Sequence, residues 1–166
     1  MRTVAFPAFP NPVDEVSARL VAGGVVLLAA SYVATGWLPL VVVLAYGFAA
    51  RVLAGPRFSP LGLLVTRALR PRLPLTPRLV PGPPKRFAQG IGAALSTLAL
   101  VLALTGAGTG ARVAVALIVG AASLESFVGF CVGCTIFGVL MRRGVIPDSV
   151  CEACNDIGLR RPVTAP

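Results

Sequence analysis

The chain contains no histidine among its 166 residues. This absence excludes Ser–His–Asp and Cys–His catalysis, histidine-ligated haem and every mixed cysteine–histidine zinc site. Charged side chains are also scarce, since only 13% of the residues are Asp, Glu, Lys or Arg. A soluble domain of this length needs more charge on its surface. With an apolar fraction of 56%, the composition indicates a protein whose solvent is lipid.

Long apolar runs fill most of the remaining sequence and predict one all-α membrane domain over residues 1–166. The expected bundle has four transmembrane helices, at about 16–35, 37–53, 87–105 and 111–141. The proline-rich start reads as an extended arm rather than a cleaved signal peptide, so the first run is expected to remain as a span. The last run is longer than the bilayer core is thick, so it must tilt, break or project, with Gly129 and Gly133 as the natural bends.

The basic residues are distributed very unevenly between the two sides of this predicted bundle. If the N-terminus is inside, 14 of the 15 lie in inner segments, and only Arg112 lies outside. The positive-inside rule then predicts that both termini, the loop 55–86 and the tail 142–166 are cytoplasmic. Within the loop, Ser59–Pro60 is a helix-start signal for a short interfacial helix, and the alternative is a loop that only sets the topology. A net charge of +9 placed in this way indicates anionic lipid headgroups, not nucleic acid, as the partner.

All four cysteines fall into two CxxC pairs, Cys131 with Cys134 and Cys151 with Cys154. The first pair is expected on one face of the last helix, in its inner half. The second follows Arg142 and Arg143. A capping box from Ser149 to Glu152 would place Cys151 in the first turn of a short helix, where backbone amides stabilise a thiolate. An exposed reactive pair beside a buried one favours thiol–disulfide exchange that needs no cofactor.

Two other readings of the cysteines stay open at this point. The spacing C-x₂-C-x₁₆-C-x₂-C also fits a four-cysteine zinc site, or less well an iron–sulfur centre, in a non-catalytic membrane protein. The thiols could instead be buried as small apolar side chains. The metal reading is weakened because the first pair lies in a hydrophobic run, where four thiolates would put negative charge beside lipid.

Glu125 is the only acidic residue inside an apolar run. Carboxylates at membrane depth are costly, which makes Glu125 a functional candidate. It could relay protons during thiol exchange or line the path of a small-solute transporter. The alternative is a protonated carboxyl group that hydrogen-bonds to a neighbouring helix. Direct contact with the cysteines would require a bend near Gly129.

Four stretches of sequence resemble the bacterial membrane proteins of domain-of-unknown-function family 4395. They are residues 11–15 (NPVDE), 55–60 (GPRFSP), 84–89 (PKRFAQ) and 125–134 (ESFVGFCVGC). The resemblance implies a small helical protein of the bacterial inner membrane and brings no established reaction. It also implies a thioredoxin-like or sulfurtransferase partner, which favours the redox reading. It gives no role to Cys151 and Cys154, and the oligomeric state stays open.

Overall fold

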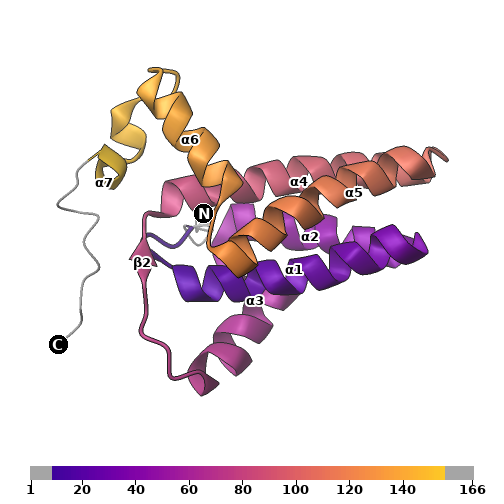
Figure 1. The fold of residues 1–166 in the computed structure, drawn as a ribbon, viewed down its shortest axis with the longest axis horizontal. Coiled ribbons are helices and arrows are strands. Elements are labelled where there is room, and N and C mark those ends of the chain that lie inside the picture. Colours follow the sequence, from indigo (N-terminus) through magenta and orange to yellow (C-terminus); the bar gives the residue numbers. More distant parts are fainter. Residues whose placement is uncertain (1–8, 156–166) are drawn as a thin grey trace, which may run out of the picture.

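In this computed structural model, four long helical stretches form the body of the molecule. The structure describes residues 9–155, without the side chains of Ala153 and Asn155. Within that range the stretches Glu15–Thr35, Leu38–Arg72, Gly82–Leu104 and Gly108–Val128 are long and apolar enough to cross a membrane. Helices α1 (Glu15–Thr35), α2 (Leu38–Ala54), α4 (Gly82–Leu104) and α5 (Gly108–Ser123) run lengthwise beside one another (Figure 1). The expected all-α bundle is confirmed.

Local sequence explains where the helices begin and end. The carboxylate of Asp14 accepts the backbone N–H groups of Val16 and Ser17 and caps α1, which ends at Gly36 in the left-handed conformation. Pro39 fits the first turn of α2. Helix α4 begins five residues before the expected position, because Pro83 and Pro84 occupy first-turn positions that need no N–H donor.

The basic loop after α2 folds mostly into helix. A 3₁₀ turn over Gly55–Arg57 leads into α3 (Pro60–Leu64), which continues as a π-helical turn (Val65–Leu69) and a 3₁₀ turn (Arg70–Arg72). As the sequence indicated, Ser59 caps this segment by accepting the N–H of Gly62. The segment slants away from the bundle (Figure 1).

A short antiparallel ladder closes the same end of the bundle. Strand β1 (Val13–Asp14) pairs with β2 (Leu79–Val80), with Val13 opposite Val80. The C-terminal end of the predicted extended arm, Val13–Asp14, is thus extended and paired with β2, whereas residues 1–8 of that arm lie outside the described residues. Beyond the four long stretches lie α6 (Val132–Arg142), a 3₁₀ turn (Asp148–Val150) and α7 (Glu152–Asn155).

The core of the bundle consists of small and branched apolar residues. α4 packs against α2, α5 and α6, and α1 packs against α2 and α5. Fully buried members include Ala29, Val41, Ala99 and Val115. Large apolar side chains also point outward along the long helices. They include Leu27, Trp37, Val42, Tyr46, Leu98, Val101, Leu104, Val113 and Leu117. Such an apolar exterior suits hydrocarbon and would be unusual in water.

Candidate functional site

The fourth long stretch ends in a sharp break just before the first cysteine pair. Helix α5 passes into a π-helical turn, Leu124–Val128, and Gly129 follows with φ +76°. The N–H of Gly129 still donates to the carbonyl of Glu125, and the N–H of Phe130 donates to that of Leu124. Only glycine adopts this left-handed conformation without strain, so Gly129 ends the span. The apolar run 111–141 thus breaks at one of its two expected bends.

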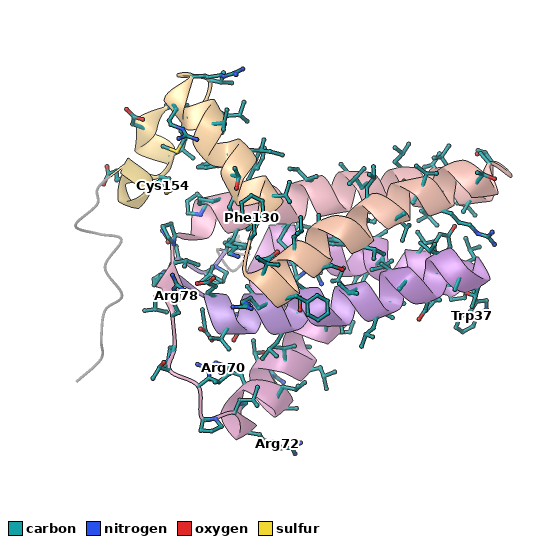
Figure 2. The ribbon with its side chains drawn as sticks, in the orientation of Figure 1. Trp37, Arg70, Arg72, Arg78, Phe130 and Cys154 are labelled. Atoms are coloured by element: carbon teal, nitrogen blue, oxygen red, sulfur yellow. A yellow bond between two sulfur atoms is a disulfide. The ribbon has the colours of Figure 1, made fainter. Side chains whose placement is uncertain are left out.

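Because of this break, the first cysteine pair begins a new helix. Cys131 is the capping residue of α6, and its Sγ accepts the N–H of Cys134 at 3.3 Å. The two residues form a disulfide with their Cα atoms 5.2 Å apart, and both are half-buried. The expectation that both lie on one face of the last helix, in the inner half of the span, is wrong for Cys131, which lies outside α6 as its capping residue. Cys131 precedes α6 because Gly129 has already terminated the span, and Phe130 lies beside the start of α6 (Figure 2).

Two cations hold the break in position, Lys85, which is buried, and Arg19, which is partly buried. Lys85 on α4 forms an ion pair with Glu125, with Nζ 2.6 Å from Oε1 and side-chain exposures of only 11% and 14%. From α1, Arg19 donates to the carbonyls of Ser126 at 3.0 Å and Phe127 at 3.2 Å. Those carbonyls lie in the π-helical turn, where regular helical partners are lost. The turn is thus fixed from two neighbouring helices.

Arg51 makes a second group of buried polar contacts at the same end of the bundle. Its Nε donates to Oε1 of Gln89 at 2.8 Å, and its Nη1 donates to the Ser59 hydroxyl at 2.9 Å. The guanidinium also lies 4.5 Å from the ring centre of Phe48. Arg51 is only 5% exposed, so these partners replace the water that it loses. One side chain thereby joins α2, the start of α3 and α4.

Asp14 ties the N-terminal arm to the basic segment. Its Oδ2 accepts from Nε of Arg70 at 2.7 Å and from the hydroxyl of Ser17 at 2.7 Å. Burial by itself would raise the pKa of Asp14. The hydrogen bonds from Arg70 and Ser17 and the charge of Arg70 outweigh burial, so the pKa lies below its ordinary value. Asp14 is therefore an ionised anchor for the basic segment.

The second cysteine pair lies beyond the far end of α6. Cys151 and Cys154 form a disulfide, with Cα atoms 5.4 Å apart. Cys151 is 5% exposed and packs with Phe137 and Met141 of α6. The expectation of an exposed pair led by Cys151 inside a helical turn is wrong, because Cys151 precedes α7 and its side chain completes a small apolar cluster.

The structure does not gather the predicted site residues into one centre. In the described part of the chain, no group of three or more Cys, Asp or Glu residues lies close enough to hold a metal ion. Each cysteine pair forms its own disulfide, and Glu125 pairs with Lys85. The first cysteine pair and Glu125 do lie on either side of Gly129. The contact of Gly133 with Ala88, one turn after Lys85, brings the start of α6 close to the Lys85 helix.

The contacts of Lys85, Arg19 and Arg51 at this end of the bundle form the polar cluster, which also includes Glu125, Gln89 and Ser59. The sequence did not predict the role of its three cations, Lys85, Arg51 and Arg19. Each is a cation at the end of an apolar run, and the first two are buried. The signal that could have found Lys85 was Glu125 itself, since a lone charge at membrane depth needs a partner of opposite charge. Arg19 is the only charged residue in the first apolar run, 16–35, so it needed hydrogen-bond acceptors for the same reason.

These features define a helical membrane protein with a polar cluster at one end of a four-span bundle. The chain belongs to the family described as a domain of unknown function (DUF4395), whose sequence profile matches residues 13–142. The resemblance seen in the sequence is thus confirmed. The match includes Cys131 and Cys134 and ends before Cys151. Comparison with curated proteins and with solved structures found no match.

Proposed function

We propose that this protein is a membrane thiol–disulfide oxidoreductase that exchanges disulfides with a thioredoxin-like or sulfurtransferase partner. The observation that carries the proposal is the CxxC pair at the start of α6. The Cys131 sulfur receives the N–H of Cys134, and both cysteines are half-buried. A reduced cysteine at a helix N-terminus has its thiolate stabilised by the backbone amides, which makes it the attacking group.

The exchange proceeds through one mixed disulfide. The Cys131 thiolate attacks one sulfur of the partner's disulfide, whose other sulfur leaves as a thiolate and takes up a proton. Cys134 then loses its proton and attacks the Cys131 sulfur, and the bond to the partner breaks. Two electrons pass to the partner, and the Cys131–Cys134 disulfide remains. The reverse sequence reduces this pair again.

The tail pair has a subordinate role in this proposal. Cys151 is covered by Phe137 and Met141, so a partner's access to it requires the tail to move. The first pair is therefore the primary site, and the tail pair exchanges after it. Glu125 and Lys85 position the loop that carries Cys131.

We further propose that the protein lies in the bacterial inner membrane with the cysteine-bearing end in the cytoplasm. The asymmetry of the basic residues supports this orientation. It places the disulfides in a compartment where thioredoxin-like reductants are abundant, which is where catalytic rather than structural disulfides are found.

A trapping experiment tests the proposal. In Cys134→Ser the first attack cannot be resolved, so a disulfide-linked complex at Cys131 should accumulate and disappear with reductant on gels. Cys131→Ser is the matched control and should trap no complex through the first pair. If purified wild-type protein carries one zinc per chain, and its four cysteines alkylate only after chelation, the protein is a zinc-clipped membrane protein instead.

A further inference from the structure

Two helical arms leave the bundle at the same end. The first is the segment Pro60–Arg72, and the second is α6, Val132–Arg142. They depart on opposite sides of the bundle, at the end that also holds β2 and α7 (Figure 1). Trp37 marks the other end (Figure 2). An arm that leaves a spanning bundle near its end lies close to the level of the lipid headgroups.

Both arms expose apolar side chains. Leu64 is 52% exposed and Leu69 is 40% exposed on the first arm, and Phe58 just before it is 55% exposed. On the second arm Ile136 is 41% exposed. These side chains lie outside both apolar clusters of the fold. In water they would be a liability, whereas at the headgroup boundary they can enter the acyl region.

Both arms also expose arginines that lack a carboxylate partner. On the first arm Arg67 and Arg72, and just before it Arg57, are exposed and form no ion pair with any residue in the range 9–155. The same holds for Arg142 and Arg143 at the end of α6. In contrast, Arg70 on the first arm is already paired with Asp14. Arginine binds phosphate oxygens with two parallel hydrogen bonds, and its apolar stem can lie along the acyl boundary.

We propose that the two arms form a collar that binds anionic phospholipid headgroups of one leaflet. The exposed apolar side chains enter the leaflet, and the five unpaired arginines hold phosphate groups of lipids around the bundle. Charge complementarity selects this occupant over a zwitterionic lipid. The collar is independent of the proposed thiol chemistry, and it places Cys131 at the membrane surface rather than within the hydrocarbon.

Fluorescence quenching by brominated lipids tests the collar. In a Trp37→Phe background, Leu64→Trp and Ile136→Trp each place one tryptophan on an arm. The purified protein is then reconstituted in bilayers of phosphatidylcholine with brominated phosphatidylglycerol or brominated phosphatidylcholine. Quenching at both positions should show a binding constant about fivefold higher for phosphatidylglycerol. Replacing the arginines of the arm that carries the tryptophan by glutamine should remove that preference, whereas Arg112→Gln, at the far end, should leave it unchanged.

A second measurement uses only the tryptophan variants in which the arginines of both arms are kept. Raising the salt from 50 mM to 1 M should reduce the preference for phosphatidylglycerol, since exposed charges are screened within about 3 Å at 1 M salt. Equal quenching by the two lipids, or no quenching by either, would overturn the collar and would fit arms that dock a soluble protein or nucleic acid. A preference that survives the glutamine variants would overturn it as well.

Discussion

At the scale of single residues, the chain satisfies its membrane-level charges by pairing them across helices. Lys85 and Glu125 are 40 positions apart, and Arg19 and Ser126 are 107 apart. A buried ion pair costs several kcal/mol of desolvation, and it is stable only when both charges are present. Removal of one member of the pair should therefore destabilise the protein far more than removal of both members.

The Lys85–Glu125 pair gives a stability prediction. Glu125→Gln should lower the free energy of unfolding by about 3 kcal/mol, because Lys85 is left charged and buried. The double variant Lys85→Met with Glu125→Met should recover most of that loss. Thermal unfolding in detergent measures both effects. Arg78→Gln is the control, since it breaks the pair of Glu15 with a 72% exposed Arg78 and should cost under about 1 kcal/mol.

The same variants separate a structural from a chemical role of Glu125. If the double variant is stable and still exchanges disulfides, Glu125 only positions the loop. If it is stable but no longer forms the mixed disulfide, Glu125 moves a proton in the exchange. Loss of solute uptake with intact disulfide exchange would instead favour the transporter interpretation.

At the scale of elements, α6 is placed by a close contact with α4. A Cβ added at Gly133 would lie 2.5 Å from Cβ and 2.6 Å from Cα of Ala88. The backbone of α4 cannot yield by that amount, so any side chain at Gly133 must push the two helices apart. The glycine between the two cysteines of the pair is thus also the packing surface of its helix.

This contact predicts opposite effects of two glycine substitutions in α6. Gly133→Ala should destabilise the protein by about 1–3 kcal/mol because of overpacking. A Cβ added at Gly138 would meet nothing within 4 Å, so Gly138→Ala should stabilise it by about 0.5–1 kcal/mol through helix propensity. Thermal unfolding measures both variants. Equal effects would mean that α6 does not pack on α4 through Gly133.

Sequence periodicity predicted most helix bounds because each span is governed locally by apolar length and by its caps. The range 16–35 corresponds to α1 and the range 37–53 to α2, within one residue at each end. Local reasoning missed the early start of α4, since prolines were read as loop. It also misplaced Cys131 and Cys151, whose positions depend on where Gly129 ends one helix and on what Phe137 covers.

The polar cluster could be predicted only in part, since its partners are distant in sequence. Glu125 stood out because it is the only acid in an apolar run. Its partner could not be chosen among several nearby cations without knowing which helices are neighbours. The contacts of Arg51 with Gln89 and Ser59 depend in the same way on the packing of α2 against α4 and on the turn that leads into α3.

At the scale of the whole molecule, the two ends of the bundle are chemically different. One end has both arms, both disulfides, the short ladder and the ion pairs of Asp14 with Arg70 and of Lys85 with Glu125. The other end has Trp37, the turn after Leu104 and exposed Arg112. Lys and Arg near the ends of spans resist translocation, so the first end should stay in the cytoplasm.

Reporter fusions measure this orientation. A fluorescent protein fused after Leu75 or at the C-terminus should be fluorescent, whereas alkaline phosphatase fused after Gly106 should be active. The reason is that Leu75 lies in an exposed loop of the basic end, and Gly106 lies in the turn between α4 and α5 at the other end. Fusions of the opposite reporter at each site are the control and should be inactive, with expression checked by blotting. Phosphatase activity at the C-terminus would place both cysteine pairs outside. The proposed exchange with a cytoplasmic dithiol would then have no route, even if the disulfides themselves were redox-active.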